Sequence, residues 1–343
     1  MNSKTLMNTL ICSTPYTFEY IQTPMPVLAA DCSILKIEKV GICGTDIHAF
    51  EGTQPYFNYP RILGHEIAAE IYETQTDSGF AKGDKVTLIP YLHCGNCIAC
   101  RNGKTNCCVH MQVLGVHTDG GMRTFLSVPN KHIIKGNQLS TDELVLVEPL
   151  AIGAHGVKRA NIVQGSYVLV VGAGPIGLGT MEMARIAGAK VIALDINQNR
   201  LDFCRDRIGV SAIINGRKDN VLEMLQTITN GDMPLAVFDC TGNLQSINQA
   251  FQYVSHGGTY VLIGLQKGEI EFNHPDFHKR ELTLMSSRNA TREDFEHVIK
   301  SIEQKKIDPK NYITHRFDFN RIKDEFESCL NPQNDIIKAI INF

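Results

Sequence analysis

Four cysteines lie within fifteen residues of the chain, and their spacing suits one tetrahedral metal ion. They are Cys94, Cys97, Cys100 and Cys108, in the pattern C-x2-C-x2-C-x7-C. Zinc held by four thiolates has no open position for a substrate, so such a site organises a loop and the chemistry lies elsewhere. Two disulfides are the alternative, but a chain without an export signal favours metal. Cys107 could replace Cys108 as far as metal geometry is concerned.

A second set of possible metal ligands is dispersed along the first half of the chain. Cys43 in GICGTDIH, His65 and Glu66 in GHE, and Glu148 in VEPLAIGAH offer a thiolate, an imidazole and two carboxylates. Catalytic zinc takes three protein ligands and keeps a fourth position open, which this set can supply. By pattern alone, however, residues scattered over about a hundred positions are more often core and surface residues.

The segment VGAGPIG has the glycine pattern of a dinucleotide-binding turn. A continuous apolar strand precedes it, proline suits the first helical turn, and an aspartate ends the next strand about twenty residues on. The glycines allow a tight turn, a close approach of the backbone to a pyrophosphate, and close helix packing. The residues expected at the cofactor are Gly172, Gly174, Pro175, Ile176, Gly177, Asp195, Arg200 and Ser286. The alternative is a glycine-rich turn with a surface aspartate.

Asp195 decides which nicotinamide cofactor is expected. Its carboxylate would accept hydrogen bonds from the adenosine ribose and repel a 2'-phosphate, which favours NAD over NADP. Arg200, five residues later, keeps NADP as the lesser alternative.

The composition is that of an ordinary globular protein. The chain has 343 residues, is 43% hydrophobic and 20% charged, and carries a formal net charge of -3. Without a Lys- or Arg-rich block, nucleic acid and anionic membranes are not expected as partners. No apolar run approaches the roughly 18 residues of a membrane span, so a cytoplasmic location is expected.

The pattern of elements changes near residue 150. Before it, short β-rich runs separated by Gly, Pro and Asn predict a largely antiparallel, barrel-like domain. After it, strands and helices alternate, which predicts a doubly wound parallel sheet in an α/β chain. The alternation ends near Glu281, and helices opened by Thr291 and Asn320 lead to the apolar tail IIKAIINF. We therefore expect a catalytic domain of residues 1–149 and 282–343 and a dinucleotide-binding domain of residues 150–281.

Taken together, the motifs resemble those of one enzyme family. GICGTDIH, YPRILGHE, the four-cysteine stretch, VEPLAIGAH and VVGAGPIGLG follow in the order found in zinc-dependent medium-chain alcohol dehydrogenases. The resemblance implies a GroES-like domain beside a Rossmann domain, NAD as cofactor, two zinc ions per chain and a homodimer or homotetramer.

The resemblance also implies roles for individual residues. Cys43 and His65 match the motif positions that bind catalytic zinc, and Glu66 and Glu148 match carboxylates that complete or exchange in its shell. The four cysteines, with Cys108 rather than Cys107, match the structural zinc lobe. Thr45 would take the hydroxyl proton and pass it, through the nicotinamide ribose, to His48. For that pair a hydrogen-bonded turn is the alternative.

Three further segments, QPYFNYPRILGHE, GVHTDGG and PDFHKRELTLMSSRNATREDF, narrow the resemblance. They are similar to bacterial L-galactonate 5-dehydrogenases and, less closely, to sorbitol and L-threonine 3-dehydrogenases. The implied reaction is oxidation of a sugar acid at C5, with L-threonine, a polyol or another aldonate as alternatives. The sequence departs from the family pattern at Met122, Arg123 and Thr124, where many relatives carry an aromatic, a small residue and a glutamate. This departure is expected to alter the entrance to the substrate site.

A carboxylate substrate needs a cationic partner, and a guanidinium can bind it through two hydrogen bonds. The candidates are Arg61, Lys279 and Arg288, each of which is individually more often a surface charge. His117 is a candidate for substrate hydroxyls, with a buried hydrogen-bonded histidine as the equal alternative. A redox-silent binding or structural relative is the non-enzymatic alternative, and the presence of Cys43 and its partners argues against it.

Overall fold

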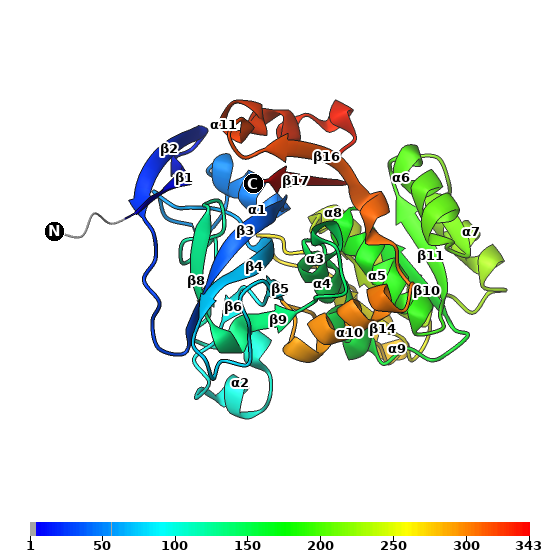
Figure 1. The fold of residues 1–343 in the computed structure, drawn as a ribbon. Helices are drawn as coiled ribbons and strands as arrows, with labels where there is room; N and C mark the ends of the chain where they lie inside the picture. Colours follow the sequence, from blue (N-terminus) through cyan, green and yellow to red (C-terminus); the bar gives the residue numbers. More distant parts are fainter. Residues whose placement is uncertain (1–4, 56) are drawn as a thin grey trace. The chain divides into compact units, whose positions relative to one another are not determined.

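The computed structural model describes residues 5–55 and 57–343 (Figure 1). The chain divides into two compact units. The β-rich unit comprises residues 1–148 and 291–343, and the α/β unit comprises residues 149–290.

The elements of the β-rich unit are mostly short strands. In chain order its strands are β1 (Leu6–Thr14), β2 (Thr17–Pro24), β3 (Cys32–Ile42), β4 (Glu66–Thr74), β5 (Lys85–Leu88), β6 (Tyr91–Leu92), β7 (Gln112–Val113), β8 (Phe125–Pro129), β9 (Ile133–Lys135), β16 (Ile313–Asp318) and β17 (Lys338–Asn342). Its helices are α1 (Gly44–Phe50), α2 (Ile98–Arg101), α3 (Thr141–Leu144), α10 (Arg292–Glu303) and α11 (Ile322–Glu325). Helix α4 (Val147–Ala160) leads from this unit into the next.

The α/β unit alternates strands and helices. Its strands are β10 (Tyr167–Val171), β11 (Lys190–Asp195), β12 (Ala212–Asn215), β13 (Ala236–Asp239), β14 (Thr259–Leu262) and β15 (Thr283–Ser286). Its remaining helices are α5 (Pro175–Ile186), α6 (Gln198–Phe203), α7 (Val221–Ile228), α8 (Leu244–Ala250) and α9 (His274–Lys279).

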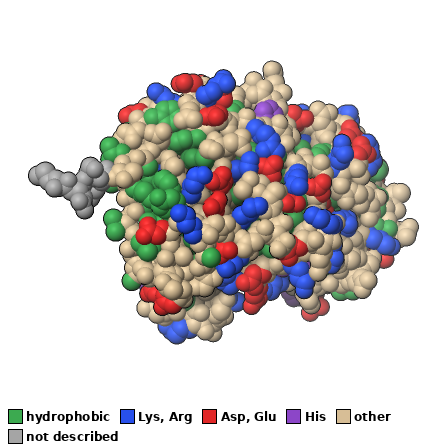
Figure 2. All heavy atoms as spheres, viewed as in Figure 1, with side chains coloured by type: hydrophobic (Ala, Val, Ile, Leu, Met, Phe, Trp, Pro, Cys, Tyr) green, Lys and Arg blue, Asp and Glu red, His purple; other side chains and the backbone are tan. Residues whose placement is uncertain are grey.

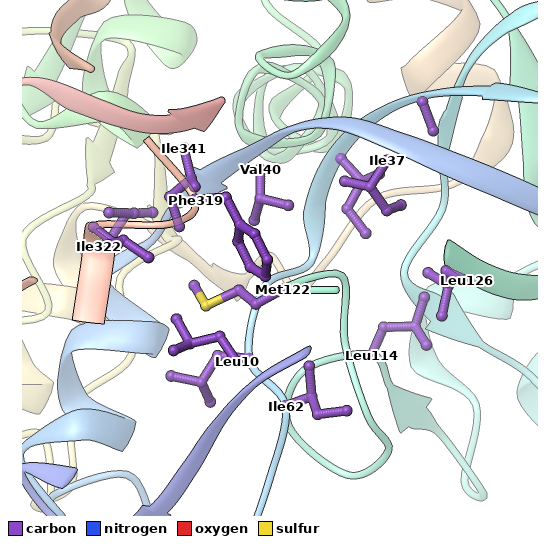
Figure 3. Close-up of a cluster of buried hydrophobic side chains, with 14 of the residues drawn as sticks. Leu10, Ile37, Val40, Ile62, Leu114, Met122, Leu126, Phe319, Ile322 and Ile341 are labelled. Atoms are coloured by element: carbon purple, nitrogen blue, oxygen red, sulfur yellow. The ribbon is translucent and has the colours of Figure 1, made fainter. Parts of the chain in front are cut away.

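Strand β3 is the centre of the main sheet of the β-rich unit. The strand order is β16-β17-β3-β4-β5-β9, with β8 also paired to β3, and only β16 and β17 pair in parallel. Apolar side chains from this sheet and from distant segments form one buried cluster, which includes Leu10, Val40, Met122 and Ile341 (Figure 3). Met122 is fully buried there, so the departure from the family pattern at this position lies in the hydrophobic core.

The α/β unit contains the expected doubly wound sheet. Its strand order is β12-β11-β10-β13-β14-β15, and every neighbouring pair is parallel. Val168 to Val170 in β10 are completely buried, as a strand covered on both faces requires. The first crossover, through α5, places the glycine-rich turn at the carboxyl end of β10, where such sheets bind ligands.

Three details differ from the sequence expectations. Strand β15 pairs with β14, so the alternation continues past Glu281 and the unit ends at Ala290, not at residue 281. Strand β12 has only four residues and gave no clear signal. Residues 62–64 do not belong to β4, because their carbonyl groups accept hydrogen bonds from the amides of Gly120, Gly121 and Met122 instead.

The surface carries both signs of charge. Figure 2 shows Lys and Arg side chains interspersed with Asp and Glu over the face that it draws. Among the described residues, no helix combines the length and the apolar character needed to cross a membrane.

Candidate active site and metal centres

The thiols of Cys94, Cys97, Cys100 and Cys108 converge in one lobe of the β-rich unit. Their sulfur atoms lie within 4.8 Å of one another. The Sγ atoms of Cys97 and Cys100 are 3.5 Å apart, those of Cys97 and Cys108 are 3.9 Å apart, and those of Cys94 and Cys108 are 3.5 Å apart. A tetrahedron with Zn–S bonds of about 2.3 Å has edges of roughly 3.8 Å, so the four thiols fit one zinc ion.

Backbone N–H groups support negative charge on these sulfurs. The amides of Cys94 and His110 each donate to Cys108 Sγ over 3.3 Å. Backbone hydrogen bonds from Cys100 and Val109 lower the pKa of the Cys97 thiol to about 6. Cys107 is exposed and stands outside the group, whereas the neighbouring Cys108 is buried and belongs to it.

Cys43, His65 and Glu66 form a second group whose ligand atoms lie within 4.8 Å of one another. Cys43 follows the end of β3 and precedes α1, and Glu66 is the first residue of β4. Strands β3 and β4 are antiparallel, with Gly41 opposite Glu66. The carboxyl end of β3 and the amino end of β4 therefore lie side by side at the same end of the sheet. His65 and Glu66 are almost completely buried, at 6% and 1% exposure.

Asp46 fixes the geometry of this group. Its Oδ2 accepts a hydrogen bond from the Cys43 amide over 2.9 Å, and its Oδ1 accepts one from the Gly64 amide over 3.1 Å. Oδ1 also lies 3.9 Å from Nδ1 of His65. One buried carboxylate therefore ties the loop that carries the thiol to the loop that carries the imidazole.

The two glutamates have different partners. Both oxygens of Glu66 lie 2.6 Å from Nζ of Lys338, on β17. Glu148, in the first turn of α4, accepts a hydrogen bond on Oε1 from the Tyr91 hydroxyl. Burial raises the pKa of Glu148, and burial together with the Glu148 carboxylate raises that of Tyr91 well above its usual range.

The charge of this pocket suits a cation. Burial alone lowers the pKa of His65, yet the Cys43 thiolate, Asp46 and Glu148 together raise it well above its usual value. Surroundings that hold an added proton so firmly are strongly negative, and a divalent ion can take the place of that proton. A thiolate, an imidazole and carboxylates are also the ligands that zinc prefers, so the residues present fit a catalytic zinc.

Thr45 and His48 lie three residues apart on α1, and therefore on one face of the helix. Thr45 is half-buried and adjoins the metal-ligand group in sequence. The His48 side chain is 61% exposed, with Nδ1 3.2 Å from Thr53 Oγ1 and 3.5 Å from Glu51 Oε2. The helix thus carries one half-buried and one exposed polar side chain.

In the α/β unit the glycine-rich turn has the close contacts that its pattern predicts. A Cβ on Gly177 would lie 1.8 Å from the carbonyl oxygen of Gly172, so no larger residue fits there. Gly172 has a φ of 96°. Gly174 caps α5, Pro175 occupies its first turn, and Ile176 follows half-buried.

Asp195 ends β11 beside this turn. Its Oδ2 accepts a hydrogen bond from the Ala173 amide over 2.6 Å, and its Oδ1 accepts one from the Asn197 amide over 2.8 Å. Arg200 Nη1 lies 4.0 Å from the position that a Cβ on Gly174 would take. Ser286 is exposed at the carboxyl end of β15, in the same sheet.

The substrate candidates are dispersed. Arg61 is paired with Asp119 through Nη1 at 3.3 Å, and His117 accepts a hydrogen bond from the Val113 amide on Nδ1 over 3.0 Å. Lys279 and Arg288 are exposed and belong to the α/β unit.

Sequence reasoning missed three residues of the pocket. Asp46 is part of the motif GTDIH but had no expected role, Tyr91 belongs to no motif, and Lys338 lies in the apolar tail. A lysine inside the strand IIKAIINF was the one available signal, since a buried lysine demands a partner.

Comparisons with known proteins agree with this geometry. Residues 30–138 match the alcohol dehydrogenase GroES-like domain, and residues 175–304 match the zinc-binding dehydrogenase domain. The chain is 41% identical to L-galactonate-5-dehydrogenase of Escherichia coli K12 over 338 residues, which cover 98% of this chain and 99% of that protein. The chain belongs to the zinc-dependent medium-chain alcohol dehydrogenase family.

Other relatives of this alcohol dehydrogenase include a sorbitol dehydrogenase and an enzyme of known structure. Sorbitol dehydrogenase of Bacillus subtilis is 29% identical over 93% of this chain and 92% of its own length. A dehydrogenase from Escherichia coli CFT073, solved with NADH, superimposes with a TM-score of 0.92 at 28% identity, covering 98% and 99% of the two chains. The protein is therefore an oxidoreductase that acts on CH–OH groups of small molecules, and the family resemblance is confirmed.

Proposed function

We propose that the protein oxidises L-galactonate at C5 to D-tagaturonate and transfers the hydride to NAD. The observation that carries this proposal is the 41% identity to L-galactonate-5-dehydrogenase over 98% of the chain. Relatives that act on sorbitol and L-threonine are less similar, at 29% and 27%. An L-threonine, polyol or other aldonate dehydrogenase is the alternative.

In this reaction the β-rich unit holds a zinc ion with ligands drawn from Cys43, His65, Glu66 and Glu148. When bound, zinc lowers the pKa of the substrate hydroxyl, and NAD accepts the hydride. Asp46 keeps the thiolate and the imidazole in position through its two backbone hydrogen bonds. Thr45 takes the hydroxyl proton, and His48, exposed at the end of the same helix, releases it to solvent.

The α/β unit selects the cofactor. The turn at Gly172 and Gly174 leads into α5, whose N-terminus suits a pyrophosphate. Two backbone amides hold Asp195 at the end of β11, where its carboxylate disfavours the 2'-phosphate of NADP. NAD is therefore the proposed cofactor, as NADH is in the related structure.

The four-cysteine group holds the second, structural zinc. We further propose a cytoplasmic homodimer or homotetramer. The cytoplasm keeps thiols reduced, which leaves the four cysteines available as zinc ligands.

The test is NADH formation by the zinc-loaded protein with L-galactonate, L-gulonate, galactitol, sorbitol and L-threonine. We expect kcat/KM for L-galactonate to be the highest of the five and to exceed those for galactitol and sorbitol by about a hundredfold, since both lack the carboxylate and a site that binds a polar group rejects substrates without it. Cys43→Ala should abolish turnover, whereas Cys32→Ala, at the start of the preceding strand β3, should not. Preference for another substrate would contradict the proposed substrate but not the reaction type. Activity in Cys43→Ala would contradict the role of Cys43 as a metal ligand.

A further inference from the structure

Helix α9 carries two histidines one turn apart, His274 and His278 (Figure 1). Residues four apart on a helix lie on the same face, and two histidines with this spacing can bind one metal ion. Both side chains are exposed, and their ring centroids are 6.0 Å apart. Among the described residues, neither imidazole takes part in a hydrogen bond or an ion pair, so the ring nitrogens are available to a ligand.

Other side chains of this segment fix α9 to the α/β unit. Phe277 packs against the hydrophobic cluster of the unit and lies with its ring centroid 5.0 Å from that of Phe272. Buried Arg280, directly after the helix, donates a hydrogen bond from Nη1 to the Val254 carbonyl oxygen over 2.8 Å and forms an ion pair with Asp276. These contacts hold the helix in place and leave the two imidazoles in solvent.

The separation of the two rings suits a single metal ion. With metal–nitrogen bonds of about 2.0–2.1 Å, two imidazoles on one tetrahedral ion have centroids roughly 5 Å apart. The observed separation of 6.0 Å is therefore about 1 Å too wide, and exposed side chains close such a gap by changing rotamer within nanoseconds. The backbone of the helix does not have to move.

The nature of the ligand atoms selects the class of ion. Imidazole nitrogen binds transition-metal ions such as Ni²⁺, Cu²⁺ and Zn²⁺, whereas Mg²⁺ and Ca²⁺ require oxygen ligands. Two nitrogens leave the other coordination positions to water, so the ion is held less tightly than by four thiolates. We therefore expect this ion to be lost on desalting, unlike the zinc ions.

The histidine pair belongs to a different part of the fold from the other candidate sites. Helix α9 is in the α/β unit, whereas both candidate zinc groups are in the β-rich unit. The helix leads into the amino end of β15, and the Arg280 carbonyl oxygen accepts a hydrogen bond from the Gly257 amide, just before β14. The glycine-rich turn lies at the carboxyl end of this parallel sheet, so an ion on α9 leaves it untouched.

We propose that His274 and His278 form a surface site for a divalent transition-metal ion, separate from both zinc sites and from the cofactor turn. The ion joins the first turn of α9 to the last. A helix of six residues is too short to be stable alone, so the bound ion braces the segment that leads into β15.

Calorimetric titration with Ni²⁺ tests the site in full-length, zinc-loaded and desalted protein without an added histidine tag. We expect one Ni²⁺ to bind per chain, with the zinc content unchanged in metal analysis. His274→Gln and His278→Gln should each weaken Ni²⁺ binding roughly a hundredfold, because one imidazole alone loses the effective concentration of the other. The double variant should be only slightly weaker than either single variant, because the chelate is already lost.

His297→Gln is the matched control. His297 is exposed and is the only histidine of α10, so its loss should leave the Ni²⁺ affinity unchanged. Titration with NADH checks that each variant is folded, and all three variants should bind NADH as the wild type does. Equal Ni²⁺ affinity in His274→Gln and the wild type would overturn the inference. A wild-type protein that takes up Ni²⁺ only in exchange for its zinc, or takes up none, would overturn it as well.

Discussion

Single buried charges connect parts of this protein that are distant in sequence. Asp46 accepts hydrogen bonds from Cys43 and from Gly64, eighteen residues farther along the chain. Lys338 reaches Glu66 across 272 residues. Each such group is costly to bury alone and stabilising only with its partners, so its removal should be felt both in folding and at the metal.

Asp46→Ala should destabilise the protein by about 3 kcal/mol, because two buried backbone amides lose a charged acceptor worth roughly 1.5 kcal/mol each. Denaturant unfolding of the zinc-loaded protein measures this. The matched control is Asp77→Ala, at an exposed position, which should stay within about 0.5 kcal/mol of the wild type. Equal stability of the two variants would contradict the bracing role of Asp46.

Asp84 gives a prediction about pH. The hydrogen bond from Lys135, with help from Asn137 and the Ala81 amide, lowers the pKa of Asp84 to about 2. A lowered pKa in the folded state means that the ionised carboxylate stabilises the protein above the unfolded pKa near 3.9, and that this contribution disappears as the pH falls toward 2.

Asp84→Asn should therefore cost on the order of 1 kcal/mol at pH 7, a value reduced for solvent screening. The difference in unfolding free energy between variant and wild type should shrink between pH 4 and pH 2. A difference that stays constant over this range would show that the charge of Asp84 does not contribute.

At the scale of elements, the strands and the turn were predictable because local patterns encode them. The apolar run of β10 and the glycine spacing before α5 follow from local geometry, and the structure has both. Short elements such as β12 and β15 were not predictable, since four residues carry little periodicity and their pairing depends on neighbours in the sheet.

The site was predictable in part for the same reason. Motifs pointed to Cys43 and His65 and to the four cysteines. In the structure Cys43 and His65 lie in one group of ligand atoms, and the four cysteines form another. The partners Lys338 and Tyr91 belong to none of the motifs, so only the three-dimensional contacts reveal them. Whether a charged residue in an apolar strand has a partner depends on the tertiary fold. The residues next to it in the sequence do not reveal that partner.

Gly177→Ala tests the turn before α5. A Cβ would clash with the Gly172 carbonyl oxygen at 1.8 Å, and overpacking of about 1–3 kcal/mol should weaken NADH binding roughly tenfold or more. Fluorescence titration of NADH measures it. Gly216→Ala is the control, because the nearest atom to its added Cβ is an ordinary 3.4 Å away. Unchanged affinity in Gly177→Ala would contradict the cofactor role of the turn.

Cys97→Ser tests the four-cysteine lobe. Loss of one thiolate should reduce the zinc content from two ions to one per chain and lower the thermal stability, because the loop then lacks its metal. Cys107→Ser, ten residues on and outside the cluster, should keep both ions. Metal analysis of the two purified variants gives the result, and two zincs in Cys97→Ser would count against the structural site.

At the scale of the whole molecule, the division of labour follows the two units. The β-rich unit brings together both candidate metal groups, and the α/β unit carries the cofactor turn with Asp195. This division accounts for the two domain matches along the chain, one GroES-like and one of the zinc-binding dehydrogenase type. In the reaction that we propose, these parts together move a hydride from C5 of L-galactonate to NAD.

The most direct test of that claim is to follow the hydrogen itself. L-Galactonate carrying deuterium at C5 is incubated with NAD and the zinc-loaded protein, and the reduced cofactor is analysed by mass spectrometry. We expect one deuterium in the nicotinamide ring and an unlabelled C5 ketone in the product. Reduced cofactor without deuterium, or no reduced cofactor at all, would contradict it.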